Sequence, residues 1–271
     1  MSLEPTTSPP KSRQTKLLWL VVAHVTVAAV GALVTGGDRG QPDTLDAIFS
    51  GIVFSQVGLL GIWVGMASNR WYIRLAGAAL GNGYLCIPVW FGDGGSSYSS
   101  IWALVCLTGC TMAVAAVLLI ARCFRIRIVR QTVPVSAAGR LQFAIRDLMI
   151  LTVVVSCVTA FGKWLLTVGF WRFEPALWGL VYVPFIAIGL LSIWPALNAR
   201  HPLLPCSIFV VIAGGVGMCF EAFGLPMGTA YWVTMTSVEA LSLVASLLVV
   251  RSCGYRLVRL APRTNEASGV A

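Results

Sequence analysis

The sequence predicts an all-α transmembrane protein: an eight-helix bundle built from two parallel four-helix repeats, with both termini in the cytoplasm. Three observations predict it. The 271-residue chain is 58% hydrophobic and only 11% charged. Soluble domains carry about 25% charged residues, so lipid must be the main solvent of this chain. Eight apolar runs are long enough to cross a membrane, and two similar basic segments close the fourth and the eighth run.

The apolar runs lie at about 17–35, 45–68, 73–92, 100–121, 148–169, 177–198, 203–224 and 230–250. Each is near the ~20 residues that span ~30 Å of hydrocarbon at ~1.5 Å per residue. Backbone polar groups in lipid must be satisfied within the segment, so each run is expected to be a helix. The first run is longer than the apolar part of a signal peptide, and it is expected to remain as a helix.

Basic residues are distributed unevenly between alternate loops. With the N-terminus inside, sixteen Lys and Arg residues fall in inner segments, and only Arg39 and Arg172 fall in outer loops. Cytoplasmic loops collect Lys and Arg, so this count predicts that both termini are cytoplasmic. The charges lie at the ends of apolar runs, which argues against nucleic-acid binding despite the net charge of +9.

The two basic segments are near copies of each other. Each has three arginines at i, i+5 and i+8: Arg122, Arg127 and Arg130 in one, and Arg251, Arg256 and Arg259 in the other. We interpret these arginines as topology anchors that hold the helix ends at the inner surface. The partners expected for them are the lipid bilayer and its anionic headgroups, each arginine adding about 1 kcal/mol of attraction.

A second match joins the second and sixth runs. Phe54-x-x-x-Gly58-Leu-Leu-Gly-Ile-Trp63 corresponds to Phe185-x-x-x-Gly189-Leu-Leu-Ser-Ile-Trp194. Together with the arginine triplets, this match predicts a duplicated unit of four helices. Four is an even number, so the units are parallel and related by a pseudo-two-fold axis along the membrane normal. Both glycines are expected at close helix contacts, where small residues let backbones approach.

The predicted organisation has five parts. Residues 1–16 form a disordered cytoplasmic tail, and 17–130 form the first four-helix repeat. A cytoplasmic linker with an interfacial helix covers 131–147. The second four-helix repeat covers 148–260, and residues 261–271 form another cytoplasmic tail.

Ionisable residues inside apolar runs are the candidates for function, because each costs roughly 2.5–3.5 kcal/mol on insertion scales. The candidates are Lys163, Glu221 and Glu239, all in the second repeat, together with the polar Asn82 between two glycines. Helix rise places Lys163 and Glu221 at similar depth near the outer side, and Glu239 nearer the midplane. They form either a binding or proton-relay site or a structural ion pair with no further role. Both interpretations stay open here.

Enzymatic and metal-binding patterns are missing from the sequence. There is no HExxH, GxSxG, P-loop or dinucleotide-binding motif, so no catalytic residue is assigned. The eight cysteines form no CxxC pair, and most lie in apolar runs, where a thiol packs as a small hydrophobe. His24 is the one histidine within a run, which makes haem ligation by two intramembrane histidines improbable. No cofactor is expected.

The entry to the fifth run, residues 141–152, reads Leu-Gln-Phe-Ala-Ile-Arg-Asp-Leu-Met-Ile-Leu-Thr. This segment resembles a motif of uncharacterised polytopic membrane proteins of planctomycete-type bacteria. The resemblance covers about a dozen residues. It implies a multi-pass protein of the bacterial cytoplasmic membrane, and it implies no activity or functional residue.

Two classes of function remain. The first is a non-enzymatic membrane component, such as an assembly partner, in which the buried charges are structural. The second is a small-solute permease with its site at the interface of the two repeats. A water-accessible cavity between the halves, lined by Glu239 or Asn82, would favour the permease, and a dry interface would argue against it.

Overall fold

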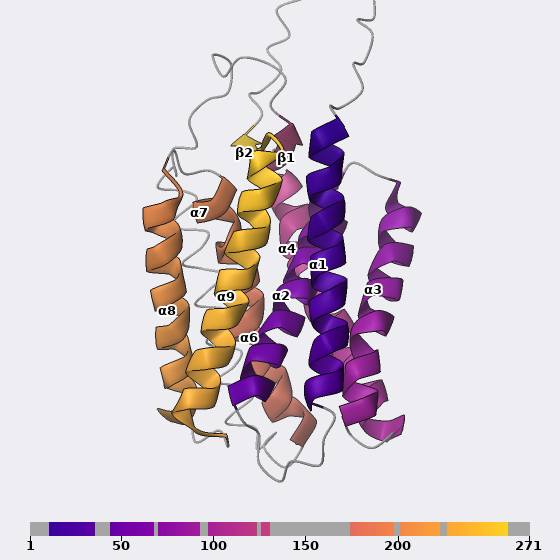
Figure 1. Ribbon diagram of the computed structural model, residues 1–271, viewed down its shortest axis with the longest axis vertical. Helices are drawn as coiled ribbons and strands as arrows, with labels where there is room; N and C mark the ends of the chain where they lie inside the picture. Colours follow the sequence, from indigo (N-terminus) through magenta and orange to yellow (C-terminus); the bar gives the residue numbers. More distant parts are fainter. Residues whose placement is uncertain are drawn as a thin grey trace, which may run out of the picture.

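The structure of the chain is a computed structural model, and it describes residues 11–35, 44–67, 70–92, 97–123, 126–130, 174–197, 201–222 and 227–259. Almost all of these residues are helical. The elements are α1 (Lys11–Thr35), α2 (Thr44–Met66), α3 (Trp71–Gly92), α4 (Ser97–Cys123), β1 (Ile126–Arg130), α6 (Glu174–Leu191), α7 (Ile193–Leu197), α8 (Leu203–Ala222), α9 (Gly228–Ser252) and β2 (Tyr255–Arg259). The helices run side by side along one long axis (Figure 1).

Four helical segments are long and apolar enough to cross a membrane. They are Thr44–Met66, Ala103–Arg122, Leu203–Phe220 and Gly228–Ser252. Many large apolar side chains on the outside of the bundle are exposed, among them Leu80 at 77% and Val211 at 74%. Such a surface is unfavourable in water and favourable in lipid. The structure thus confirms the coarser prediction of an α-helical chain with apolar helices suited to a membrane protein. The predicted fifth run, 148–169, and the linker 131–147 lie outside the described residues.

Helices α2 and α9 lie in the middle of the bundle and pack along each other, with α8 and α3 on opposite sides (Figure 1). Glycine makes this close contact possible. A Cβ at Gly51 of α2 would lie 2.5 Å from the carbonyl oxygen of Met235 and 3.1 Å from the backbone nitrogen of Glu239. Gly61 and Gly65 likewise face Val114 and Leu118 of α4. Small residues at helix contacts are the expected source of tight packing in lipid.

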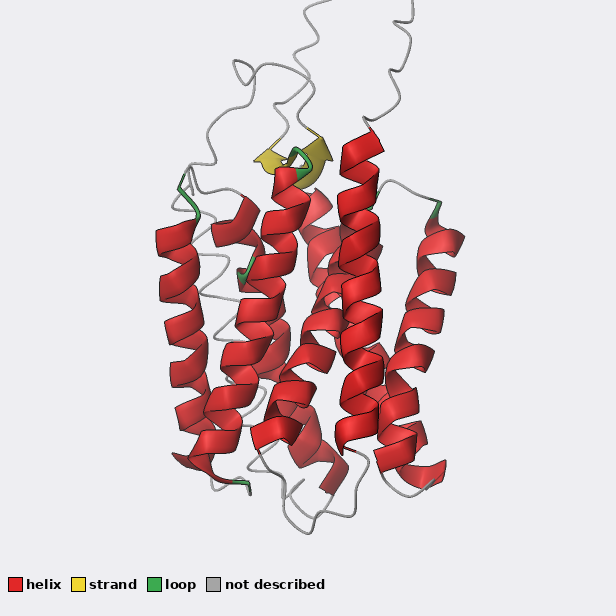
Figure 2. Ribbon diagram, viewed as in Figure 1, coloured by secondary structure: helices red, strands yellow, loops and turns green. Residues whose placement is uncertain are grey.

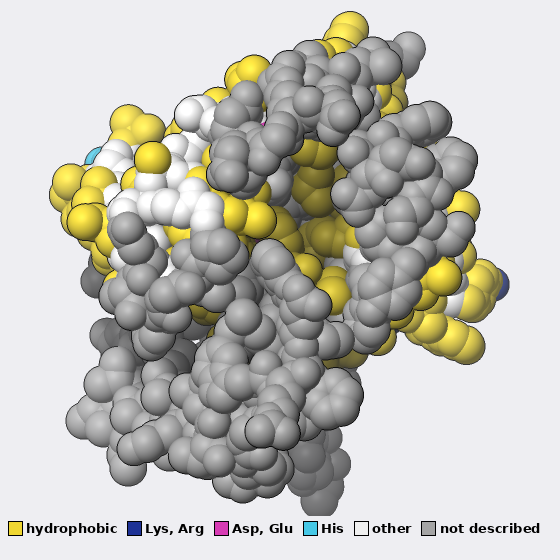
Figure 3. Space-filling view, turned by 90° about the horizontal axis from the view of Figure 1, so that it is seen from below, with side chains coloured by type: hydrophobic (Ala, Val, Ile, Leu, Met, Phe, Trp, Pro, Cys, Tyr) yellow, Lys and Arg dark blue, Asp and Glu magenta, His cyan; other side chains and the backbone are white. Residues whose placement is uncertain are grey.

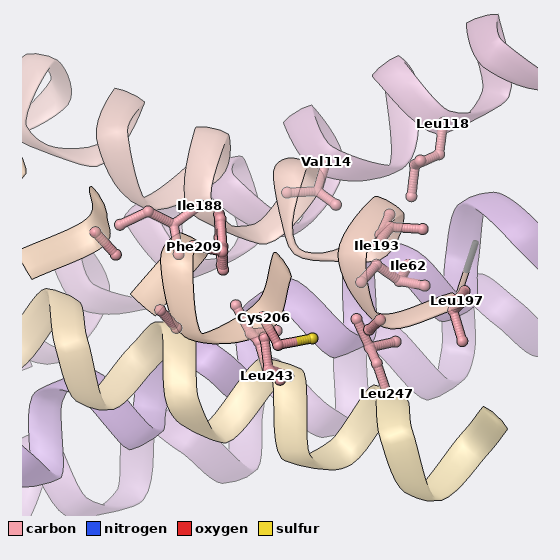
Figure 4. Close-up of a cluster of buried hydrophobic side chains, with 14 residues drawn as sticks. Ile62, Val114, Leu118, Ile188, Ile193, Leu197, Cys206, Phe209, Leu243 and Leu247 are labelled. Carbon is pink, nitrogen blue, oxygen red and sulfur yellow. The ribbon is translucent and has the colours of Figure 1, made fainter. Parts of the chain in front are cut away.

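Residues from the two halves of the chain share the largest apolar cluster. Ile62, Val114 and Leu118 come from the first half, whereas Leu197, Leu243 and nine others come from the second. Figure 4 shows these side chains pointing toward one another from α2, α4, α6, α7, α8 and α9. A second cluster is aromatic: Phe54 and Phe185 stack with ring centroids 4.4 Å apart and planes 17° apart. These two clusters make much of the described contact between the halves apolar, and hydrogen bonds such as that between Ser50 and Tyr231 also cross it.

The sixth apolar run is not one continuous helix. It was expected as a single span over 177–198, but α6 ends at Leu191 and α7 begins at Ile193, with a turn at Ser192. Pro195 has no N–H, so the carbonyl of Leu191 cannot receive its normal helical hydrogen bond. The hydroxyl of Ser192 donates to the carbonyl oxygen of Gly189 at 2.8 Å. Both features disturb the helical hydrogen-bond ladder at this point.

Two short strands were not predicted, and they correct the purely helical fold class. The strands β1 and β2 form an antiparallel pair at the end of the bundle where α1 begins (Figure 2). Each begins with an apolar-basic-apolar triplet, Ile126-Arg127-Ile128 and Tyr255-Arg256-Leu257, a local alternation typical of a strand, which then ends at an apolar pair. The positive φ of 92° at Gly254 lets the chain turn from α9 into β2. The sequence interpretation treated these residues only as basic anchors and overlooked the alternation.

Helix α1 is also longer than expected, because it begins at Lys11, inside the segment 1–16 predicted to be disordered. Residues 11–16 read Lys-Ser-Arg-Gln-Thr-Lys. Lys, Arg and Gln are good helix formers, so the helix can extend beyond its apolar part. Residues 1–10 lie outside the described ranges.

Candidate functional site

The structure describes two of the four predicted intramembrane site residues in full. Glu239 lies in α9 and Asn82 in α3, and both side chains are buried, each 1% exposed. Glu221 belongs to helix α8, but its side chain lies outside the described residues. Lys163 lies outside them entirely. The predicted pairing of Lys163 with Glu221 therefore stays a prediction.

Glu239 occupies the middle of α9, eleven residues after its first residue and thirteen before its last. At ~1.5 Å per residue, the side chain is about 17 Å from one end of the helix and about 20 Å from the other. Gly51 of α2 packs against the backbone of α9 at this level. Within the described part of the chain, Oε2 of Glu239 is buried and has no hydrogen-bond partner. A buried polar atom without a partner is costly, and such an atom in a folded protein calls for an explanation.

The residues near Glu239 come from helices α4 and α6. Cys110 of α4 is close enough to Glu239 to interact with it electrostatically. Tyr182 of α6 is in turn close to Cys110 and within hydrogen-bonding reach of the thiol of Cys106. The carboxyl group thus shares the interior with two thiols and a phenol. In the part of the chain that is described, no group of three or more His, Cys, Asp and Glu residues could hold a metal ion.

Asn82 lies at a different helix contact from Glu239. Its Oδ1 accepts a hydrogen bond of 3.1 Å from the hydroxyl of Thr111, which is also fully buried. Its Nδ2 is buried without a partner among the described residues. The structure therefore places Asn82 between α3 and α4, whereas Glu239 lies on α9 with its backbone against Gly51 of α2 and its side chain near Cys110 of α4. No hydrogen bond joins the two side chains within the described ranges.

Polar contacts that hold α1 were missed by sequence reasoning. Nε2 of His24 lies 2.8 Å from the hydroxyl of Ser246 in α9. The backbone carbonyls of His24 and Val25 accept hydrogen bonds from Gln56 of α2 at 3.0 Å and from Tyr84 of α3 at 2.7 Å. The segment of α1 at His24 and Val25 is therefore hydrogen-bonded to α9, α2 and α3. These partners lie 32 to 222 residues away along the chain, so sequence spacing could not reveal them.

The predicted anchor arginines lie at one end of the bundle. Arg122 donates to the carbonyl oxygen of Ala67 at 3.5 Å, and Arg251 donates to that of Ala196 at 3.0 Å. Arg256 donates to the carbonyl oxygen of Arg251 at 2.9 Å. Partial burial, and then the charge of Arg251, lower the pKa of Arg256. The remaining anchors, Arg127, Arg130 and Arg259, belong to the strands, and their side chains lie outside the described residues.

The end of the bundle opposite the strands is hollowed in the space-filling view (Figure 3). The described side chains that are visible in this hollow are mostly hydrophobic.

Comparison with known proteins gives no further assignment. No model of a protein family, no curated protein and no solved structure matches the chain.

Proposed function

We propose that the chain is a multi-pass protein of the bacterial cytoplasmic membrane, built from two parallel four-helix repeats, and that it acts as a non-enzymatic membrane component. The observation that carries the proposed role is the apolar seam between the halves. Phe54 stacks on Phe185 in this seam, and a Cβ at Gly58 would lie 3.7 Å from the Cα of Gly189. Close contacts of this kind between the described parts of the two halves are what a rigid scaffold requires.

The duplication is supported by contacts between matched residues. A two-fold axis is the operation that brings a residue against its own counterpart. Phe54 contacts Phe185, and Gly58 contacts Gly189. The strand register obeys the same two-fold relationship. Ile128 pairs with Leu257, its own counterpart 129 residues later, and Arg127 pairs with Val258, the counterpart of Val129. Sequence matches between apolar helices arise easily by chance, whereas three such contacts between counterparts would not be expected by chance.

The arginine contacts support the same relationship. Arg122 and Arg251 are 129 residues apart, and so are their acceptors Ala67 and Ala196. Each arginine donates to a carbonyl at or just beyond the end of a helix, where backbone oxygens lack helical partners. A cation near a helix C-terminus is also favourable electrostatically.

The proposed topology is tested with reporter fusions at Gly40, Gly95, Val135, Arg172, Arg200 and Gly228 and at both termini. Cytoplasmic signals are expected at Val135, at Arg200 and at both termini. External signals are expected at the other four positions. An external signal at Val135 would overturn both the topology and the parallel repeat.

Native thiols can test whether the seam is dry. Cys110 is 5% exposed and lies beside Glu239. If the protein is a scaffold, a small water-soluble thiol reagent should leave Cys106 and Cys110 unmodified in the folded protein and modify both after unfolding. Modification of Cys110 in the folded protein would contradict the dry seam.

A small-solute permease is the second candidate, and it is favoured by the unpartnered Oε2 of Glu239 and Nδ2 of Asn82. Polar groups of this kind inside a bundle are typical of substrate or ion pathways. Proteoliposome swelling in isosmotic solutions of small neutral and charged solutes tests this candidate. A permease should give swelling that is reduced by Glu239→Gln, and no swelling with any solute would exclude it for the solutes used.

We also propose that the strand end of the bundle lies against anionic lipid headgroups. All six anchor arginines belong to this end, three in each half. Thermal stability should therefore be higher in vesicles containing phosphatidylglycerol than in vesicles of phosphatidylcholine alone. Equal stability in the two would contradict the lipid contact.

A further inference from the structure

Among the described residues, Arg74, Asn82 and Glu239 each have a buried side-chain atom without a hydrogen-bond partner, and Glu239 is the acid of the three. Ser192, Thr236 and Ser246 donate to carbonyls of their own chain segment, so their polarity is satisfied locally. Oε2 of Glu239 is buried and finds no such partner in the described ranges. An ionised carboxylate in this setting would lack both water and a counter-charge, whereas a neutral carboxylic acid avoids most of that cost.

Packing alone does not require a carboxyl group at this position. With the offset of 129 residues, the counterpart of Glu239 is Cys110, and the two residues are close together in the interior. A thiol therefore fills the corresponding place in the first half. The carboxyl group is a difference between the halves, and a carboxylic acid is a much stronger acid and a more polar group than the thiol of Cys110.

Polar groups extend from Glu239 toward the strand end. Ser242 and Ser246 follow Glu239 at i+3 and i+7, so they lie on the same face of α9. The hydroxyl of Ser246 donates to the carbonyl oxygen of Ser242 at 2.8 Å. A hydroxyl has one hydrogen to donate, so Nε2 of His24, 2.8 Å away, must donate to Ser246. Two hydroxyls and an imidazole thus lie between the midplane and the strand end.

Other ionisable groups facing α9 are few in the described part of the chain. They are Cys110 of α4, Tyr182 of α6, His24 of α1, and, toward the ends of the bundle, Asp46 of α2 and Cys206 of α8. Within this set His24 is the one nitrogen base, and its imidazole can both accept and donate a proton. His24 is therefore the group best suited to exchange a proton with the carboxyl group of Glu239.

We propose that Glu239 is a proton-binding site at the centre of the bundle, and that it exchanges its proton with the strand end along the face of α9 that carries Ser242 and Ser246, with His24 as the terminal base. In this route the Ser246 hydroxyl rotates away from the carbonyl of Ser242, and each hydroxyl takes up one proton as it gives another away. This inference goes beyond the scaffold role, and it does not require that any solute be transported. Its ligand is the proton, bound at a carboxylate oxygen.

A hydrophobic carbodiimide tests the site directly. In dicyclohexylcarbodiimide, the O–H of a protonated carboxyl adds across a C=N bond, and the product rearranges to a stable N-acylurea without loss of any group. Full-length protein in liposomes should gain the mass of one reagent molecule at the peptide that contains Glu239. The reagent needs the protonated form, so labelling should decrease as the pH is raised.

Three variants make the labelling specific. Glu239→Gln should lose the label, and Asp46→Asn should keep it. If Glu239→Gln does not fold, Glu239→Cys copies the residue of the other half and should fold without taking the label at that peptide. No label at Glu239 at any pH, or equal label at every pH, would overturn the proton-binding site.

The route is tested separately by infrared spectroscopy after a pH jump. The C=O band of the protonated carboxyl should decay in the wild-type protein and be absent in Glu239→Gln. Ser246→Ala removes the hydroxyl between His24 and the Glu239 level, so the decay should become several-fold slower. An unchanged decay in Ser246→Ala would overturn the route through His24. Because these readouts involve no uptake, their failure differs from a failure of the permease candidate.

Discussion

Arg122 and Arg251 make the same contact in the two halves of the chain, each donating to a backbone carbonyl 55 residues earlier. The donor–acceptor distance is 3.5 Å for Arg122 and 3.0 Å for Arg251. The acceptors, Ala67 and Ala196, lie at or just beyond a helix end. The arginines therefore link the end of one helix to the end of another in each half.

The two contacts should contribute unequally to stability. Hydrogen bonds weaken as the donor–acceptor distance grows, so Arg251→Gln should cost more than Arg122→Gln. A loss of about 1–2 kcal/mol is expected for Arg251, because its donor is charged. Thermal unfolding in detergent measures both variants. Arg70→Gln is the control, since the hydrogen bond of Arg70 to Tyr72 is exposed, and it should change stability little.

Gly58 should tolerate no large side chain. A Cβ at this position would lie 3.2 Å from Cδ2 of Leu243 and 3.7 Å from the Cα of Gly189. Gly58→Leu should therefore destabilise the protein by about 1–3 kcal/mol through overpacking. Gly109 of α4 is the matched control, because a Cβ there meets nothing within 4 Å. Gly109→Leu should be neutral or slightly stabilising, since glycine is a poor helix former.

Comparison of Gly58→Leu with Gly109→Leu also defines the result that would contradict this prediction. If Gly58→Leu and Gly109→Leu have the same melting temperature, the close contact of the two halves at Gly58 is wrong. Chemical cross-linking of the variants would then be needed only to locate the actual neighbours of Gly58.

Phe54 and Phe185 should be energetically coupled. Their rings are stacked at 4.4 Å, and aromatic pairs contribute about 0.5–1.5 kcal/mol beyond the area they bury. A double-mutant cycle with Phe54→Leu and Phe185→Leu measures this term from equilibrium unfolding. The coupling should lie in that range. Phe54→Leu combined with a change at the distant, exposed Trp71 is the control pair and should give additive effects.

Whether the sequence could predict a feature depends on how far apart in the chain its interacting residues lie. Helices α2, α8 and α9 follow from local apolar composition, and the depth of Glu239 follows from counting residues along a helix. The contacts Phe54–Phe185 and Gly58–Gly189 involve residues that the sequence match had already singled out. These features depend on local composition or on internal similarity, both of which are readable from one chain.

The features that were missed depend on partners chosen by the folded structure. Gln56 and Tyr84 donate to backbone carbonyls of α1, and a carbonyl leaves no mark in the sequence. The pairing of β1 with β2 joins segments 125 or more residues apart. The interruption at Ser192 was in principle readable from Pro195, but prolines are tolerated in membrane helices, so the signal was ambiguous.

The attachment of α1 should depend on Ser246 more than on Gln56. Gln56→Leu removes a donor to the carbonyl of His24, but that carbonyl belongs to a helix and can keep its backbone partner. Ser246→Ala instead removes the partner of the His24 ring at 2.8 Å. Side-chain hydrogen bonds between membrane helices average about 0.6 kcal/mol, with a maximum near 1.7 kcal/mol. Equilibrium unfolding should place Gln56→Leu near the average and Ser246→Ala above it, and the reverse order would contradict this assignment.

Asn82 and Thr111 allow the structural role of a buried polar pair to be measured. The hydroxyl of Thr111 donates to Oδ1 of Asn82, and Nδ2 of Asn82 has no partner in the described part of the chain. Thr111→Val leaves the whole amide unpaired and should destabilise the protein by about 1–3 kcal/mol. Asn82→Leu added to Thr111→Val replaces both partners by apolar groups, and the double variant should recover most of the loss. If the double variant is as unstable as Thr111→Val, Asn82 has a further partner and the pair is not simply structural.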